Sequence, residues 1–136
     1  MDRFNEYFGE MRRTDALICD EEISALELRL KTKFPDDFRL FLKRVDGYEG
    51  FVGKSYVHLA GVNDMEELTD AYCSESYPDK ICIGSDGGGE VFVLDRSGSN
   101  QRFGVVPAIG EENDYIELGD TFSRFLDRLY QGIVLK

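Results

Sequence analysis

Apolar residues recur at the spacing of an amphipathic helix in five parts of the chain. The predicted helices cover residues 4–11, 20–30, 35–45, 64–72 and 121–130. Asp20 is a candidate N-cap for the second helix, and Pro35 suits the first position of the third. Glycines at 47 and 132 are placed to end two of the helices. We expect the last four helices to direct the following residues toward a core: Ile23, Leu26, Leu30, Phe38, Phe41, Leu42, Val45, Met65, Leu68, Tyr72, Phe122, Phe125, Leu126, Leu129 and Tyr130.

Strand-like runs of β-branched and aromatic residues fill the second half of the chain. Residues 81–85 and 91–95 read as a central β-hairpin, and further strands are predicted at 55–59, 102–106 and 115–118. The glycines at 50 and 53 predict a loop before the first of these strands. Because consecutive strands are joined by short connections, an antiparallel meander is the simplest arrangement.

Three consecutive glycines, Gly87, Gly88 and Gly89, form the predicted hairpin turn. Such a run is tolerated where the backbone needs a positive φ or where another segment comes close. Asp86 precedes the glycines, and an aspartate in this position commonly accepts hydrogen bonds from nearby backbone N–H groups. The sequence therefore predicts a single α+β domain over residues 1–136. We expect a mostly antiparallel sheet with the N-terminal helices and the C-terminal helix packed against it, concentrated on one face.

The net charge constrains the partners. The 136 residues include 16 Lys and Arg against 27 Asp and Glu, a formal charge of −11. Long-range forces therefore favour a basic protein partner and disfavour nucleic acid and anionic membranes. The charged N-terminus lacks the apolar core of a signal peptide, and no apolar run is long enough for a membrane span. Three widely spaced cysteines, Cys19, Cys73 and Cys82, are expected to be reduced thiols of a cytoplasmic protein.

The acidic residues are concentrated in two segments. Residues 64–90 contain eight carboxylates and one lysine, and residues 111–120 contain five carboxylates and no basic residue. A solvated face that maintains solubility is the simplest interpretation. The functional alternative is a docking face for a basic protein, because like-signed carboxylates raise association rates. The candidate partner-binding residues are Glu66, Glu67, Asp70, Asp86, Glu90, Glu112 and Asp114.

Few residues carry the pattern of a catalytic or metal site. His58 is the single histidine, and it lies in a predicted strand with no cysteine or second histidine at ligand spacing. Asp86 and Glu90 lack the alternating oxygen ligands of a calcium loop. The segment 47–55 resembles a P-loop but has the wrong glycine spacing and would follow a helix. Phosphate binding by the triple-glycine turn stays as a minor alternative. We expect no cofactor, no metal and no catalysis.

Several motifs in the chain occur together in one known group. They are Asp20 to Glu27, Phe34-Pro35-Asp36-Asp37-Phe38 to Leu42, Asp46-Gly47, Ile83 to Gly89 with Phe92 and Leu94-Asp95, and Phe122 to Leu126. In order and spacing these motifs resemble the SUKH superfamily, in its Smi/Knr-like branch. Phe34 stands where leucine is usual, and Asp46 stands where asparagine is usual.

The resemblance implies an α+β fold without catalytic residues. It also implies a bacterial immunity protein that binds and neutralises a polymorphic toxin, often a nuclease. Fungal relatives regulate cell-wall synthesis, so a regulatory scaffold for a cellular enzyme is the alternative. A small nucleotide- or phosphate-binding protein is a more distant one. A neighbouring toxin gene would favour the first function, and thermal stabilisation by nucleotides would favour the last.

Overall fold

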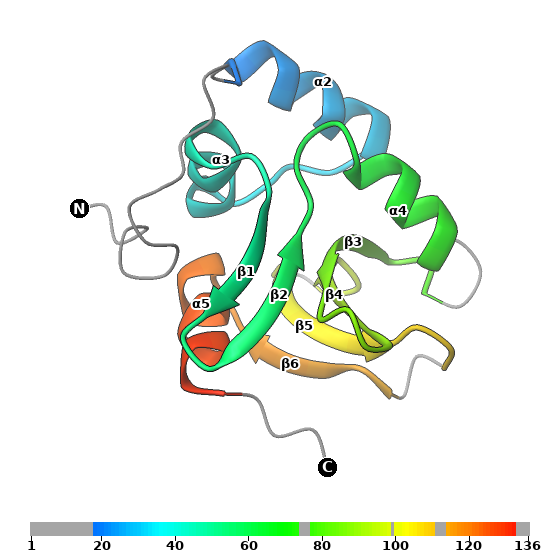
Figure 1. Cartoon of the computed structure of the whole chain (residues 1–136). Helices are drawn as coiled ribbons and strands as arrows, with labels where there is room; N and C mark the ends of the chain where they lie inside the picture. Colours follow the sequence, from blue (N-terminus) through cyan, green and yellow to red (C-terminus); the bar gives the residue numbers. More distant parts are fainter. Residues whose placement is uncertain (1–17, 74–76, 99, 111–113, 133–136) are drawn as a thin grey trace.

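The computed structural model describes residues 18–73, 77–98, 100–110 and 114–132. Within these ranges the chain forms four helices and six strands (Figure 1). In chain order they are α2 (Asp20–Leu30), α3 (Asp36–Arg44), β1 (Tyr48–Val52), β2 (Ser55–Leu59), α4 (Met65–Tyr72), β3 (Lys80–Ser85), β4 (Glu90–Asp95), β5 (Arg102–Pro107), β6 (Ile116–Gly119) and α5 (Phe122–Gln131). The helix predicted over residues 4–11 lies outside the described residues.

The strands form one antiparallel sheet in the order β1-β2-β3-β4-β5-β6, which confirms the predicted meander. The central pair β3 and β4 is the hairpin expected from the sequence. β2 meets β3 through only two residue pairs, His58 with Ser85 and Leu59 with Gly84. Beyond them α4 lies beside β3, where the Thr69 hydroxyl accepts a hydrogen bond of 3.0 Å from the Cys82 N–H. The helix thus takes the place of a strand neighbour along that half of β3.

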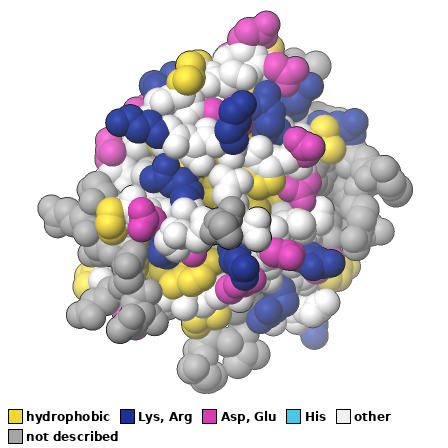
Figure 2. All heavy atoms as spheres, turned by 180° about the vertical axis from the view of Figure 1, so that it is seen from behind, with side chains coloured by type: hydrophobic (Ala, Val, Ile, Leu, Met, Phe, Trp, Pro, Cys, Tyr) yellow, Lys and Arg dark blue, Asp and Glu magenta, His cyan; other side chains and the backbone are white. Residues whose placement is uncertain are grey.

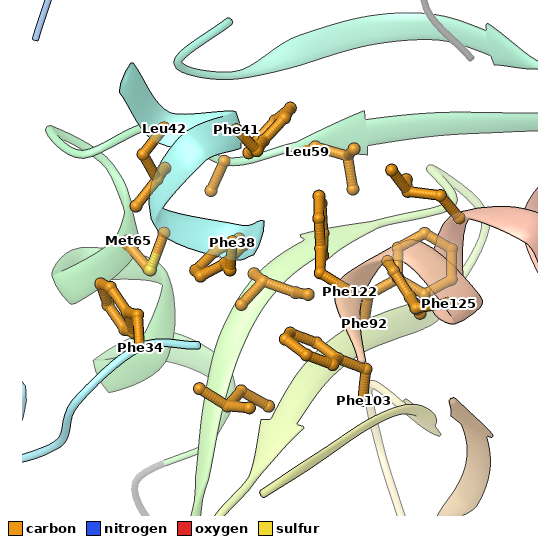
Figure 3. Close-up of a cluster of buried hydrophobic side chains, with 14 of the residues drawn as sticks. Phe34, Phe38, Phe41, Leu42, Leu59, Met65, Phe92, Phe103, Phe122 and Phe125 are labelled. Carbon is orange, nitrogen blue, oxygen red and sulfur yellow. The ribbon is translucent and has the colours of Figure 1, made fainter. Parts of the chain in front are cut away.

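The larger core lies between one face of the sheet and helices α2, α3 and α5. Its centre is a group of phenylalanine rings, shown in Figure 3. The Phe122 ring of α5 lies 5.0 Å from the Phe38 ring and 5.1 Å from the Phe41 ring of α3, measured between centroids. Contacts in this range add stabilisation beyond the burial of apolar area. These rings fix α3 and α5 against the sheet.

A smaller core lies on the opposite face of the sheet, because side chains alternate along each strand. It contains Cys73, Tyr77, Cys82, Val91, Val93 and Val106. Tyr77 lies on this face, and its hydroxyl donates a hydrogen bond of 2.8 Å to the Pro107 carbonyl. The helices are concentrated on the face of the larger core, as expected, and only the end of α4 reaches the smaller core. Met65, at the start of α4, joins the larger core, whereas Cys73, just past its end, joins the smaller one.

Some local predictions need correction. Residues 48–52 form strand β1 and not a loop. Their backbone N–H and C=O groups pair with those of β2, and the glycines do not prevent this pairing. Cys19 is the N-cap of α2, and Asp20 is the first helical residue. Pro35 is the N-cap of α3. Tyr72 and Tyr130, expected in the core, are exposed at the ends of their helices.

Candidate protein-binding surface

Helix α4 carries the first group of candidate residues, Glu66, Glu67 and Asp70. Glu66 accepts a hydrogen bond of 2.8 Å from the Arg29 guanidinium of α2, and both side chains are about half exposed. An exposed pair of this kind adds little stability, but it cancels the charge of Glu66 at long range. Glu67 and Asp70 are exposed. The negative charge of α4 is therefore smaller than its sequence predicts.

The β3–β4 turn brings together Asp86 and Glu90. The Asp86 Oδ1 atom accepts hydrogen bonds from the N–H groups of Gly88 at 2.7 Å and Glu90 at 3.1 Å, which confirms its predicted role as a turn residue. Gly87 and Gly89 have φ values of 77° and 109°, a region that disfavours other residues. Burial, and then repulsion by Asp86, raises the pKa of Glu90.

The same hydrogen bonds bear on the phosphate-binding alternative. A phosphate held by a glycine-rich loop needs several backbone N–H groups directed at it. Here the Gly87 N–H donates to the Ser85 hydroxyl at 3.3 Å, and the N–H groups of Gly88 and Glu90 donate to Asp86. Because these N–H groups already donate to Ser85 and Asp86, and because the Asp86 carboxylate would repel a second anion, the turn is poorly suited to bind phosphate.

The outer face of the β1–β2 hairpin was not expected from the sequence. Phe51 pairs with Tyr56 and Glu49 pairs with His58 across the two strands, so all four side chains lie on one face. The rings of Phe51 and Tyr56 meet edge to face with centroids 5.4 Å apart. They are 61% and 40% exposed. The Tyr56 hydroxyl donates a hydrogen bond of 2.5 Å to Glu49, and this bond raises the pKa of Tyr56.

The inner side of the same hairpin is anchored in the molecule. Val52, Val57 and Leu59 are fully or almost fully buried in the larger core. At the tip, the Lys54 N–H donates to the Tyr130 carbonyl at 3.1 Å, and the Ser55 hydroxyl donates to the Leu129 carbonyl at 2.6 Å. Both carbonyls belong to the last turn of α5, where carbonyls lack a partner further along the helix; that of Leu129 also accepts the Gly132 N–H at 3.2 Å. The exposed aromatic pair therefore stands on a fixed platform.

The β3–β4 turn borders this hairpin. His58 of β2 pairs with Ser85, and a side chain at Gly87 would lie 3.8 Å from the Tyr56 ring. We call the outer surface of β1 and β2 the hairpin face; it consists of Glu49, Phe51, Tyr56 and His58. Ser85 and Val91 share the side of the sheet with His58, so the alternation along β4 directs Glu90 to the other side, and Asp86 belongs to the bordering turn. Among the residues that the structure describes, no Lys or Arg forms an ion pair with Glu49, Asp86 or Glu90.

The last candidates belong to the connection between β5 and β6. Asp114 lies near the end of this connection and is exposed, whereas Glu112 lies outside the described residues. The Ala108 N–H donates a hydrogen bond of 2.8 Å to the Gly89 carbonyl, so the loop begins beside the β3–β4 turn. Further along, Glu117 pairs with Arg102 at 2.7 Å. Acidic and basic side chains are interspersed on the face shown in Figure 2. Acidity is therefore not uniform over the surface.

The remaining features give little support to chemistry at this surface. Within the four described ranges no cluster of three or more His, Cys, Asp or Glu could hold a metal ion. His58 is exposed on its strand, as expected of a sheet residue. Burial raises the pKa of Cys73 to about 12 and that of Cys82 to about 11, so both thiols are poor nucleophiles. No helix in the described part of the chain is long and apolar enough to cross a membrane.

The fold and its motifs match a known family. Residues 18–128 match the model of the SMI1 / KNR4 family (SUKH-1). The chain belongs to this family. It is also similar to a protein of Bacillus subtilis (strain 168) with the name "Uncharacterized protein YnaB", with 30% identity over 112 residues that cover 80% of this chain and 74% of that protein. The resemblance inferred from the motifs is thereby confirmed.

The region that matches the family model covers nearly all of the helices and strands of the structure. The matched region begins just before α2 and ends within α5, so it includes every strand of the sheet. Proteins of the SMI1 / KNR4 family are generally non-catalytic. Membership of this family is consistent with an immunity or regulatory role through protein binding. The hairpin face lies within the matched region.

Proposed function

We propose that this protein is a non-catalytic immunity protein that binds a cognate, basic toxin and neutralises it. The observation that carries the proposal is the combination of SMI1 / KNR4 membership with three carboxylates that have no basic partner among the described residues, Glu49 on the hairpin face and Asp86 and Glu90 in the bordering turn. A toxin that acts on nucleic acid needs a positive surface to bind its substrate. An acidic protein that covers this surface removes the toxin from its substrate by sterics and charge together.

Several acidic residues from the sequence remain part of the proposal. Asp86 and Glu90 belong to the β3–β4 turn, and Asp114 belongs to the neighbouring connection between β5 and β6. Glu67 and Asp70 are placed on the exposed side of α4, and Glu66 is paired with Arg29. We propose that these groups raise the rate of encounter, since their field extends over about 8 Å at physiological salt. All three cysteines are free, which supports a reducing compartment, the cytoplasm.

The proposal is tested in cells with the product of the adjacent reading frame. That product is expressed alone and together with this chain, and growth is measured. We expect growth to stop with the neighbouring protein alone and to recover with both. A complex of the two purified proteins should elute as one species in size-exclusion chromatography. If the neighbouring protein is harmless and forms no complex, the immunity function is wrong and the regulatory scaffold becomes the better hypothesis.

Charge reversal separates electrostatic from purely steric neutralisation. The triple variant Glu66→Lys, Glu67→Lys and Asp70→Lys should associate with the toxin about tenfold more slowly than the natural chain. Substituting lysine at Glu117 alone, on the edge strand β6, is the control and should have a smaller effect. A tight complex that is unaffected by the triple variant would contradict the participation of α4.

A further inference from the structure

The hairpin face combines two features that are rarely left open to solvent together. Phe51 is exposed, although the other phenylalanines in the described residues are all buried. Its ring and that of Tyr56 form a continuous aromatic surface, with Glu49 hydrogen-bonded to the tyrosine. The β3–β4 turn borders this surface, because a Cβ at Gly87 would lie 3.8 Å from the Tyr56 ring. Exposed aromatic patches rimmed by polar groups are typical of interaction sites.

We propose that this face is the docking site for an arginine side chain on a basic segment of the partner protein. The inference rests on the proposed function and names the surface that gives it specificity. Aromatic rings attract a cation over their faces, and arginine adds planar stacking to that attraction. A carboxylate at the edge of the rings, here Glu49, accepts guanidinium N–H groups. Lysine offers a point charge without the planar stack.

The platform is preorganised for such an occupant. Val52 and Val57, on the inner side of the hairpin, are buried, and the hairpin tip is hydrogen-bonded to the end of α5. The rings therefore lose little additional freedom when a partner binds. Interface residues that dominate affinity are commonly aromatic residues and arginine in paired positions. Phe51 and Tyr56 are the aromatic half of such a pair.

Charge decides among the possible occupants. Nucleic acid and anionic membranes would place phosphates against Glu49 and near the bordering turn with Asp86 and Glu90, and these carboxylates repel phosphate. A second copy of this chain also carries a formal charge of −11 and would place carboxylates against carboxylates. A basic segment of another protein is the occupant that the charges favour. The site on α4 is less suited, because Arg29 already pairs with Glu66.

The test uses the whole chain and three short peptides that alternate glycine with arginine, lysine or citrulline. Citrulline keeps the shape of arginine and removes its charge. Binding is followed by the chemical shifts of backbone amides in a ¹⁵N-labelled sample. We expect the arginine peptide to shift amides of residues 49–58 and 86–90 and to bind about fivefold more tightly than the lysine peptide. The citrulline peptide should cause no shifts there.

Two variants and a control localise the effect. Phe51→Thr keeps a strand-favouring residue and should weaken the arginine peptide about fivefold. Tyr56→Phe keeps the ring but releases Glu49, so its effect should be smaller. Ile116→Thr is the matched control, because Ile116 is 41% exposed on the other edge strand. It should leave the affinity within about twofold. Unchanged far-ultraviolet circular dichroism establishes that each variant is folded.

Other outcomes would overturn the inference. These are shifts confined to α4, equal binding of the arginine and citrulline peptides, and concentration-dependent dimerisation through the hairpin. The toxin itself distinguishes this inference from the function. If the natural chain binds the toxin and Phe51→Thr binds it equally well, the docking site is wrong while the function stands. If no toxin binds, the function fails, and the peptide titration still decides whether the face recognises arginine.

Discussion

Glu27 offers a direct test of how α2 and α3 are held together. The residue lies in the second half of α2 and is only 7% exposed. Its Oε2 atom accepts a hydrogen bond of 2.7 Å from the Phe34 N–H, in the segment that leads into α3. Its Oε1 atom accepts one of 2.8 Å from Arg39 within α3. One buried carboxylate therefore joins two elements of the fold.

Replacement by glutamine isolates these bonds from packing. The amide has one acceptor oxygen, so Glu27→Gln can satisfy either Phe34 or Arg39 but not both. A hydrogen bond to a charged group contributes about 1.5–3 kcal/mol. Because the Arg39 side chain is 22% exposed, water replaces part of its interaction. We expect Glu27→Gln to lower the free energy of unfolding by about 2 kcal/mol, which corresponds to roughly 6–10 °C in Tm.

Urea denaturation followed by circular dichroism measures this change. Glu67→Gln, at an exposed position of α4, is the control and should remain within about 0.5 kcal/mol of the natural chain. Arg39 also pairs with Asp20 at 3.3 Å, so a double-mutant cycle of Glu27→Gln with Arg39→Gln is needed to extract their coupling. We expect about 1 kcal/mol of coupling. A loss below about 0.5 kcal/mol for Glu27→Gln would refute this account of the α2–α3 contact.

Two further predictions concern motif positions. Burial raises the pKa of Asp46 above 3.8, so protonation of this carboxyl favours the folded state and that stabilisation is lost as the pH rises through the raised pKa. Asp46→Asn retains an acceptor for the Val62 N–H and should stabilise the protein at neutral pH. Because the side chain is partly exposed and water screens the effect, we expect a gain of roughly 0.5 kcal/mol that shrinks in acid. Equal stability of the two chains in urea at neutral pH would contradict this. A side chain at Gly84 would collide with the His58 carbonyl, so Gly84→Ala should lower the free energy of unfolding by about 1–3 kcal/mol. A side chain at Gly88 would meet only the Asp86 carboxylate at 3.6 Å, so the control Gly88→Ala should lower it by less than about 0.5 kcal/mol. Equal thermal midpoints of the two variants would contradict this prediction.

The parts of the fold that follow local rules were predictable from the sequence. The stripe of Phe38, Phe41 and Leu42 identified α3 and its buried side, and all three are in the larger core. The glycine turn after Ser85 identified the central hairpin. Both signals depend on the pattern of neighbouring residues, which can be read from the sequence alone. The meander followed from short connections.

The parts that depend on tertiary contacts were not predictable in this way. Gly50 and Gly53 indicated a loop, but β2 offers a pairing partner that makes residues 48–52 a strand. Because β1 was missed, the aromatic pair of Phe51 and Tyr56 was missed with it. Tyr56 alternates with Val57 in a predicted strand, and this alternation was the one available signal for an outward-facing aromatic residue.

The candidate acidic residues show the same limit. Sequence segments located the carboxylates but not their partners. Glu66 is paired with an arginine that lies 37 positions earlier in the chain, and Glu117 is paired with one that lies 15 positions earlier. Glu49 lies outside both acidic segments, yet it belongs to the hairpin face. Which charges remain uncompensated is decided by the packing of α2 on α4 and of β5 on β6.

The dependence of toxin association on salt tests the central claim most directly. Stopped-flow mixing of this chain with its toxin gives the association rate constant at low and high ionic strength. If an acidic surface guides binding, the rate constant should fall by about tenfold or more between roughly 0.05 and 0.5 M salt, and the fall should be smaller when Glu49, Asp86 and Glu90 are replaced by their amides. A rate constant that is the same at both salt concentrations, in the natural chain and in the amide variant, would contradict the account.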